Sequence, residues 1–200
     1  MKLILVRHGE TLWNKERRFQ GVSDIELSEN GLKQAEKLGV ALKSETIEAI
    51  YTSPLKRAFQ TALKIGVYHN APLSVKAELQ ELNQGDFEGL TINVLTENHG
   101  DFLKKWLLNP ASCIMPNGES LTMLQDRAWP VIKRIIKSNR NTLVVAHNFT
   151  LMTIICKFLN LSLSDFRKVH IDTASITIVT IDRGDPIVSL LNDTSHLADD

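Results

Sequence analysis

Two arginines and two histidines lie at the ends of predicted β-strands. Arg7 and His8 directly follow an apolar run at residues 3–6, whose unalternating side chains indicate a strand buried on both faces. His147 directly follows a second such run, and Arg57 comes within one helical turn of a third strand. Ligands of open α/β sheets bind beyond the carboxyl ends of parallel strands, so we expect these four side chains to meet. If these polar residues only ended their strands, arginine and histidine would not be expected at the ends of three different strands.

These residue types favour an anion site. Arginine presents a planar fork of donors to phosphate or carboxylate oxygens and stays charged at any relevant pH. Arg7 and Arg57 would repel each other in one pocket unless an anion were bound, which favours a multiply charged anion such as phosphate. Either histidine could be a nucleophile, an acid, a base or a ligand near neutral pH. A metal site is disfavoured, because no third His, Cys or carboxylate falls at zinc-ligand spacing and the arginines would repel a cation.

The segment at residues 78–89 supplies carboxyl groups that could donate a proton to a leaving group. It contains Glu78, Glu81, Asp86 and Glu88, beside glycines that let the backbone approach a ligand closely. A nucleophile that attacks phosphorus needs such a donor for the departing alcohol. The residue types alone do not say which acid is used.

Strand and helix patterns alternate along most of the chain, which predicts an α/β fold with a mostly parallel sheet. We expect strands at residues 3–6, 49–51, 73–75, 142–146, 174–181 and 187–191. We expect helices at residues 28–42, 54–67, 91–108, 119–137 and 151–159, and a turn at 183–186. Ser28 is a typical N-cap, Pro54 suits a first helical turn, and Pro130 predicts a kink or break inside its helix.

Two long helical patterns stand together in the middle of the chain, and we interpret them as a helical insertion at about residues 91–138. Phe102, Trp106 and Trp129 lie in it, and we expect them to pack in a core rather than stack on a substrate. No repeat, low-complexity stretch or linker divides the sequence. We therefore expect one domain over residues 1–200.

The composition is that of an ordinary globular protein. The 200 residues are 43% hydrophobic and 23% charged, with 23 basic and 23 acidic side chains. This balance argues against a diffuse surface for nucleic acid, and no run resembles a membrane span or a secretory signal. Cys113 and Cys156 stand far apart, as core thiols do. We expect a cytoplasmic protein without nucleic-acid or membrane partners, in which an exposed apolar strand at 174–181 could pair with a second copy to form a homodimer.

Four motifs in a fixed order resemble the histidine phosphatase superfamily, also called phosphoglycerate-mutase-like. The resemblance spans residues 2 to about 197 and includes a matching tail at 192–197. One Arg-His-Gly tripeptide would be weak evidence, whereas four spaced motifs in order make a chance match negligible. The motifs are Leu5-Val6-Arg7-His8-Gly9-Glu10-Thr11 with Asn14, Ser53-Pro54-Leu55-Lys56-Arg57-Ala58 with Thr61, Glu81 ahead of Gly85-Asp86-Phe87-Glu88-Gly89, and Val144-Val145-Ala146-His147.

The resemblance implies a three-layer α/β/α fold and catalysis without a metal or cofactor. It implies that His8 is transiently phosphorylated and that Arg7, Arg57 and His147 line the phosphate pocket. Glu81 would protonate the leaving oxygen and then activate water. His8 must present a neutral nitrogen, so we expect its other ring nitrogen to donate to a backbone carbonyl. Glu81 must carry a proton part of the time near neutral pH, which burial would favour and the arginines would oppose.

The resemblance also implies residues that hold the substrate. Asn14 would add a hydrogen-bond donor, and Gln20 and Gly21 match the loop that approaches the phosphate. Two positions depart from the common pattern. Asn148 replaces the usual glycine, and Gln84 stands where many members have an aromatic residue and some a histidine. Gln84 could hydrogen-bond the part of the substrate other than the phosphate.

We interpret the sequence as that of a phosphomonoesterase for a small phosphorylated metabolite. The resemblance suggests phosphoserine first, and α-ribazole 5′-phosphate or sugar phosphates as other candidates. The main alternative is a cofactor-dependent phosphoglycerate mutase, which must keep the phosphoenzyme from water and is typically longer than this chain. A third alternative is an inactive module that only binds phosphorylated ligands. It is disfavoured because such a module would tolerate the loss of His8, Glu81 and their neighbours, which are all present.

Overall fold

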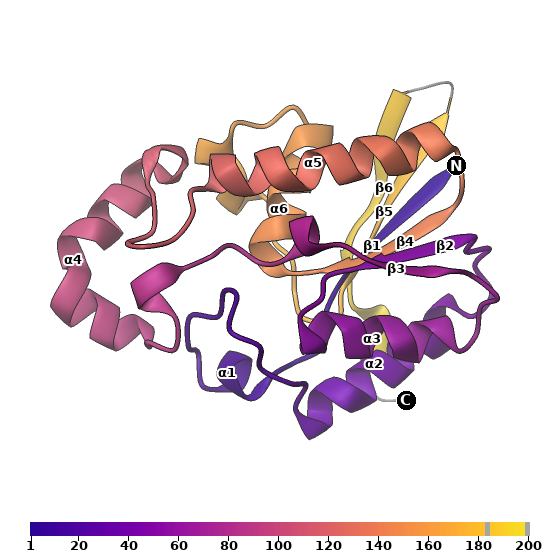
Figure 1. The fold of residues 1–200 in the computed structure, drawn as a ribbon, viewed down its shortest axis with the longest axis horizontal. Helices are drawn as coiled ribbons and strands as arrows, with labels where there is room; N and C mark the ends of the chain where they lie inside the picture. The colour runs from indigo at the N-terminus through magenta and orange to yellow at the C-terminus, as the bar shows by residue number, and fades with distance from the viewer. Residues whose placement is uncertain (183–184, 199–200) are drawn as a thin grey trace.

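The computed structural model describes residues 1–182 and 185–198, and a six-stranded sheet forms its centre (Figure 1). The strands lie in the order β3-β2-β4-β1-β5-β6. Their bounds are β1 (Lys2–Arg7), β2 (Ala49–Thr52), β3 (Leu73–Val75), β4 (Thr142–Ala146), β5 (Ile176–Asp182) and β6 (Asp185–Asp193). The first four are parallel, whereas β5 is antiparallel to β1 and β6 is antiparallel to β5. The mostly parallel sheet predicted from the sequence is confirmed.

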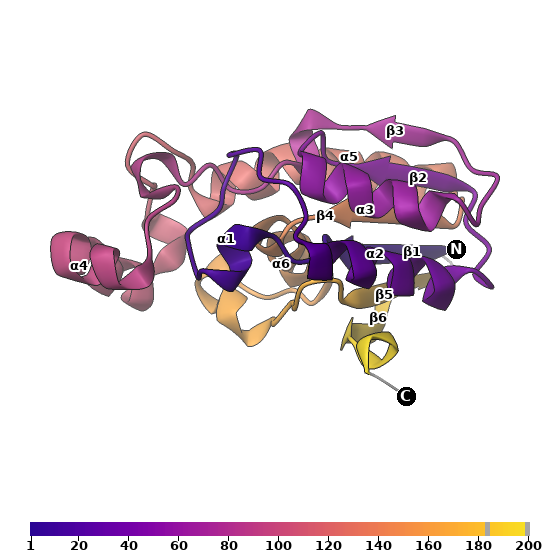
Figure 2. The same cartoon turned by 90° about the horizontal axis from the view of Figure 1, so that it is seen from below.

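Alternate residues of the central strands bury opposite faces of the sheet. In β1, Leu3 and Leu5 belong to one core cluster, and Ile4 and Val6 belong to the other. Two helices cover each face, so the fold has three layers, with α5 above the sheet and α2 and α3 below it in Figure 1. Figure 2, seen from below, shows α2 and α3 in front of the strands. These helices are α2 (Glu29–Leu42), α3 (Lys56–Gly66), α5 (Leu121–Ser138) and α6 (Asn148–Phe158).

The remaining helices lie outside these layers. They are α1 (Leu12–Lys15), α4 (Ile92–Leu108) and short 3₁₀ helices at Ala77–Leu79, Gly85–Phe87, Pro110–Ser112, Leu163–Lys168 and Ser195–Leu197. α4 projects from the body in both views (Figures 1 and 2). Within the described part of the chain, no helix has the length and apolar character needed to cross a membrane.

The segment interpreted as an insertion, residues 91–138, has two parts with different surroundings. α5 buries Leu124, Val131 and other apolar residues in the same cluster as Leu3, so it belongs to the main layers. α4 is the part that projects in Figures 1 and 2, whereas the loop after it buries Cys113 and Met115 in the same cluster. Aromatic residues of both parts pack in the core as predicted, with Trp106 buried in the cluster and Phe102 and Trp129 against it.

The break predicted at Pro130 is wrong. α5 continues through this residue as one helix. Proline removes one backbone donor, whereas the buried face of α5 keeps the helix packed on both sides of it. The interruption lies in α4 instead, where His99 has non-helical angles (φ −135°, ψ 30°).

Helix starts follow local capping. Ser28 accepts from the backbone N–H of Gly31 at 3.0 Å, which confirms the predicted N-cap of α2. α6 begins at Asn148, three residues before the predicted start, because His147 already occupies its N-cap position. His147 makes no capping hydrogen bond with its side chain.

The apolar strand predicted at residues 174–181 is not exposed. β5 lies inside the sheet between β1 and β6, and Ile176, Val179 and Ile181 are buried. It therefore offers no free edge to a second copy, and the prediction that it pairs across a homodimer is wrong for this strand. The edge strand on this side of the sheet is β6, which is longer than the predicted 187–191. The first two residues of the turn predicted at 183–186 lie outside the described residues.

Candidate active site

The carboxyl ends of β1 and β4 lie side by side. Arg7 pairs in register with Ala146, and the backbone N–H of His8 donates to the Ala146 carbonyl at 3.1 Å. The rings of His8 and His147 are 5.1 Å apart between centroids. The neighbouring strand β2 is followed by α3, and Arg57 in the first turn of α3 contacts His147. The structure thus brings together the four side chains expected to meet.

A backbone carbonyl holds the ring of His8 in one tautomer. Nδ1 lies 2.7 Å from the carbonyl oxygen of Gly9, which can only accept, so Nδ1 carries the proton and Nε2 the lone pair. Burial first, and then the charges of Arg57 and Arg7, lower the pKa of His8 well below its ordinary value. The ring is therefore neutral at pH 7, and Nε2 is available as a nucleophile. The predicted backbone acceptor is confirmed.

The ring of His147 has the opposite tautomer. Arg57 Nε donates to Nδ1 of His147 at 3.2 Å, so the proton of the neutral ring lies on Nε2. Burial, followed by the charge of Arg57, lowers the pKa of His147 and keeps the ring neutral. His147 is fully buried, and its Nε2 has no hydrogen-bond partner among the described residues. Because a buried donor without a partner is costly, this N–H suits an oxygen of a bound ligand.

The guanidinium of Arg57 is not among the groups that line the cavity, and its contacts are with other parts of the protein. Its Nη1 donates to the carbonyl of Ser23 at 2.8 Å and its Nη2 to the carbonyl of Gly21 at 2.7 Å. Burial lowers the pKa of Arg57 to about 10, so it remains charged at neutral pH. Arg57 therefore fixes both His147 and the loop that contains Gly21. Its predicted contact with the phosphate stays a prediction.

A capping box orients Asn14 and Gln20. Asn14 Oδ1 accepts from the backbone N–H and the hydroxyl of Thr11, at 3.1 and 3.0 Å. A hydroxyl has one proton, so Gln20 must present its NH₂ group to the Thr11 oxygen, 2.6 Å away. This orientation places the Gln20 oxygen 3.2 Å from Arg57 Nη1 and 2.6 Å from Arg57 Nε, whose single N–H is shared between this oxygen and His147 Nδ1. The NH₂ group of Asn14 is left to donate into the cavity that Asn14 lines.

Glu81 is buried and reaches the start of α6. Its Oε2 accepts from the backbone N–H of Phe149 at 3.0 Å, and its Oε1 from those of Thr150 at 3.1 Å and Leu82 at 2.9 Å. The carboxyl thus provides the cap that His147 does not. Burial raises the pKa of Glu81, and outweighs the hydrogen bonds and the two arginines that lower it. Glu81 is therefore suited to carry a proton at higher pH than an ordinary carboxyl.

Seven of the predicted residues line one cavity of about 230 Å³. They are Arg7, His8, Asn14, Gln20, Glu81, Gln84 and Asn148. Arg57, His147 and Gly21 are not among the residues that line this cavity. A Cβ at Gly21 would overlap the Leu82 carbonyl and the Glu88 carboxyl, so this glycine allows a close backbone approach.

Three residues of the wall, Arg18, Phe19 and Phe149, were not predicted from the sequence. Each directly adjoins a predicted residue or lies two positions from one, and this proximity was the available signal. Arg18 places a second guanidinium at the cavity besides Arg7, and its Nε is ion-paired with Glu16 at 2.5 Å. It also donates to the Gly89 carbonyl at 2.8 Å.

The cavity combines a nucleophile, a proton donor and anion-binding groups. Arg7 donates to the Ile171 carbonyl through Nη1 at 2.6 Å, and its buried Nε has no partner among the described residues. His8 offers a lone pair, and Glu81 is the one carboxyl in the described wall. A ligand with several anionic oxygens would satisfy the free donors, so the site is suited to a phosphate ester.

Comparisons with known proteins agree with this chemistry. The family model of the histidine phosphatase superfamily (branch 1) matches residues 3–194. Phosphoserine phosphatase 1 of Hydrogenobacter thermophilus is 32% identical over 201 residues, covering 100% of this chain and 95% of that protein. The probable phosphoglycerate mutase GpmB of Yersinia pestis is 30% identical over 204 residues, covering 98% and 95%. The solved structure of Bacillus stearothermophilus YhfR has a TM-score of 0.92 and 31% identity, covering 98% of this chain and 99% of that one.

The family match covers almost the whole chain, and the three-layer fold is that of the similar solved structure. The motifs that carry the resemblance fall around one cavity, which His8 lines and next to which His147 lies, with 5.1 Å between the two ring centroids. The chain therefore belongs to the histidine phosphatase superfamily (branch 1) and is a phosphatase of this type.

Proposed function

We propose that the chain hydrolyses a small phosphomonoester in two steps, through a phosphohistidine at His8 and without a metal ion. In the first step, Nε2 of His8 bonds to phosphorus as the bond from phosphorus to the ester oxygen breaks. The departing oxygen takes the proton of Glu81 and leaves as an alcohol. Arg7, Asn14 and His147 Nε2 stabilise the charge on the transferred phosphoryl group.

In the second step, a water molecule attacks the phosphorus of the phosphoenzyme. Glu81, now a carboxylate, takes one proton of this water. The bond from phosphorus to Nε2 breaks, and its electron pair returns to His8. Inorganic phosphate leaves and Glu81 is again protonated, so the cycle closes.

The tautomer of His8 carries this proposal. The hydrogen bond from Nδ1 to the Gly9 carbonyl leaves the lone pair on Nε2, and the low pKa of the ring keeps that lone pair free at neutral pH. The raised pKa of Glu81 supports its role as the proton donor. Arginine charges at the cavity support catalysis without a metal, because they supply the positive charge that Mg²⁺ supplies in other phosphoryl transfers.

Trapping the intermediate tests the proposal. The enzyme is mixed with substrate and quenched in alkali, where phosphohistidine survives, and the peptide that contains His8 is analysed by mass spectrometry. We expect phosphate on His8, no phosphate on this peptide in His8→Asn, and a fall in kcat of at least about 1000-fold in that variant. Phosphate on another residue, or a variant with full turnover, would refute the proposal.

Chelation tests the independence from metal. We expect phosphate release in EDTA at the rate seen without it. A loss of activity that Mg²⁺ or Zn²⁺ restores would overturn this part of the proposal.

We propose phosphoserine as the first substrate candidate, before α-ribazole 5′-phosphate and sugar phosphates. Gln84 donates through Nε2 to the Gln20 carbonyl at 3.2 Å, which turns its buried Oε1 away from that carbonyl. This Oε1 has no partner among the described residues, and the side chain lines the cavity. An ammonium group next to the phosphate would satisfy it. Arg18 supports an acidic substrate, since its charge suits a carboxylate, and a phosphoserine phosphatase is among the relatives.

A panel of phosphate esters tests the substrate. We expect the highest kcat/KM for phosphoserine. We also expect Gln84→Met to lower it about tenfold, with little effect on an ester that has no donor near the phosphate. An equal effect on both esters would remove Gln84 from substrate selection.

Phosphoglycerate mutase activity is the second candidate, because one relative is a probable phosphoglycerate mutase. The test is incubation with 3-phosphoglycerate and a trace of 2,3-bisphosphoglycerate. We expect slow release of phosphate and no isomerisation. Rapid isomerisation without phosphate release would reverse the ranking.

We also propose that the protein works in the cytoplasm as a homodimer. Buried, unpaired Cys113 and Cys156 support a reducing compartment. The edge strand β6 exposes Ile187 and Leu191, which supports pairing with a second copy. Light scattering at micromolar concentration is expected to give twice the mass of the chain, and a monomer mass would contradict the dimer.

A further inference from the structure

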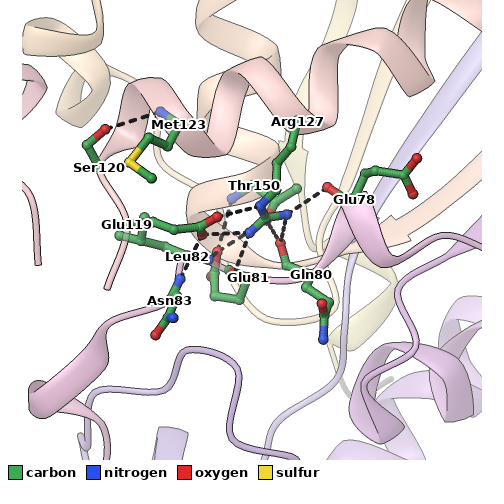
Figure 3. Close-up of polar contacts among 10 residues, drawn as sticks. All are labelled: Glu78, Gln80, Glu81, Leu82, Asn83, Glu119, Ser120, Met123, Arg127 and Thr150. Atoms are coloured by element: carbon green, nitrogen blue, oxygen red, sulfur yellow. Dashed lines mark hydrogen bonds and ion pairs between the residues drawn. The ribbon is translucent and has the colours of Figure 1, made fainter. Parts of the chain in front are cut away.

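Arg127 of α5 points at the backbone around Glu81 (Figure 3). Its Nη1 donates to the carbonyls of Glu78 at 2.7 Å and Gln80 at 2.9 Å, and its Nη2 donates to the carbonyl of Glu81 at 2.8 Å. Residues 80–84 belong to no helix or strand, so no ladder of backbone hydrogen bonds holds this stretch. One planar guanidinium therefore fixes three carbonyls within four residues.

Glu119, which directly precedes the N-cap of α5, completes the network (Figure 3). Its Oε1 accepts from Arg127 Nε at 2.8 Å, and its Oε2 accepts from Arg127 Nη2 at 2.9 Å. The same Oε2 accepts from the backbone N–H of Asn83 at 3.0 Å, and the N–H of Glu119 donates to the Asn83 carbonyl at 2.8 Å. Arg127 thus holds the chain before Glu81 and at Glu81 itself, and Glu119 holds the chain after it.

The two ends of the Glu81 side chain are therefore held by different helices. Its backbone is fixed by α5 through Arg127, and its carboxyl is fixed by the first N–H groups of α6. Arg127 does not line the cavity, so it does not touch a substrate there. Any effect of Arg127 on the reaction must pass through the segment that it holds.

We propose that Arg127, oriented by Glu119, is a positioning residue for proton transfer by Glu81. The inference rests on the role of Glu81 in the proposed function. The guanidinium of Arg127 sets how far the Glu81 backbone lies from α6. It therefore also sets where the protonated carboxyl oxygen of Glu81 meets the leaving group. A misplacement of about 1 Å can cost about 100-fold in rate, so a network of this kind has a catalytic effect without contact with the substrate.

Leaving groups of different basicity isolate this role. An alkyl phosphate needs a proton on its leaving oxygen, whereas p-nitrophenyl phosphate leaves as a stable anion and needs little help. For each ester, kcat/KM reports the steps up to release of the alcohol. We expect Arg127→Lys, which keeps the charge and loses the fork, to lower kcat/KM about 10- to 100-fold for the alkyl ester and less than about threefold for the nitrophenyl ester.

Two further variants complete the set. Glu119→Gln keeps the shape of the side chain and removes its charge, so we expect the same selective loss, and it carries the test if Arg127→Lys does not fold. Arg134→Lys is the matched control. Arg134 lies on the same helix, and its Nη2 lies 3.5 Å from the Glu78 carboxylate, so this variant is expected to keep wild-type values for both esters.

A double-mutant cycle with Glu81→Gln decides whether Arg127 acts through Glu81. We expect Arg127→Lys to have almost no further effect on the alkyl ester once Glu81 lacks its carboxyl. Equal losses for both esters, or losses that multiply in the double variant, would overturn the positioning role. If Glu81→Gln itself does not favour the nitrophenyl ester, the proposed function of Glu81 fails instead, so the two failures are distinguishable.

Discussion

Arg57 and His147 are joined by a hydrogen bond from Nε to Nδ1 at 3.2 Å, although 90 residues separate them in the chain. A guanidinium can only donate, so this contact fixes the His147 lone pair on Nδ1 and its proton on Nε2. The bond also ties a motif at the start of α3 to a motif at the end of β4. Two side chains that are each common in phosphate sites therefore depend on each other for their orientation.

The first prediction concerns Arg57→Lys. Lysine keeps the charge but cannot bond His147 and the carbonyls of Gly21 and Ser23 together. We expect kcat/KM to fall about 100-fold or more, and the free energy of unfolding to fall by about 1–3 kcal/mol. Steady-state kinetics and urea denaturation measure the two effects. Lys56→Arg, an exposed neighbour, is the control, and wild-type kinetics in Arg57→Lys would contradict the prediction.

The second prediction concerns stability in acid. Burial lowers the pKa of His147 in the folded protein. The unfolded chain therefore binds a proton at this residue near pH 6.5, whereas the folded protein does not. Stability should therefore fall as the pH drops below about 6.5, by about 1.4 kcal/mol for each unit of pKa shift. His147→Gln is expected to flatten this decline in urea midpoints measured from pH 8 to 5. An undiminished decline in His147→Gln would contradict the shift.

The third prediction has the opposite sign. The pKa of Glu81 is raised by burial, so the folded protein holds this proton to higher pH than the unfolded chain. This contribution is present at acid pH and is lost as the pH rises from about 4.3 through the folded pKa. Glu81→Gln should therefore gain stability relative to wild type over that range. A constant difference between the two proteins from pH 4 to 8 would contradict the shift.

The fourth prediction uses two glycines. Gly85 has φ +53°, and a Cβ there would overlap the Pro116 carbonyl, whereas a Cβ at Gly100 meets nothing within 4 Å. We expect Gly85→Ala to lower the free energy of unfolding by about 2–4 kcal/mol. Gly100→Ala lies in α4 and should change it by less than about 1 kcal/mol, in the stabilising direction. Equal changes in the free energy of unfolding at both sites would contradict the prediction, because the two glycines differ in backbone φ and in the room for a Cβ.

Side chains at strand ends could be predicted from the sequence. His8 and His147 each follow an apolar run, and a buried parallel strand leaves its next residue at the carboxyl edge. The tautomer of His8 could also be anticipated, because a nucleophilic nitrogen requires the other nitrogen to donate. These features depend on residue types and on the spacing of apolar residues, and both can be read directly from the sequence.

Other features depend on partners that leave no mark in the sequence. Arg127 binds backbone carbonyls, and any residue type supplies a carbonyl, so nothing marks it as different from Arg134 on the same helix. β5 alternates apolar residues with threonine as a half-exposed strand does, but strand order decides that it lies inside the sheet. The balance of burial against arginine charge at Glu81 likewise needed the folded structure.

The start of α6 has a consequence for redesign of this scaffold. His147 is the N-cap residue of this helix, but its side chain bonds Arg57 and makes no capping hydrogen bond, so the missing acceptor comes from Glu81. Replacing Glu81 by alanine to introduce new chemistry would also leave backbone N–H groups at the start of α6 without an acceptor. An amide retains an acceptor there, so glutamine is the replacement with which to begin, and any smaller residue needs a new acceptor supplied from another part of the chain.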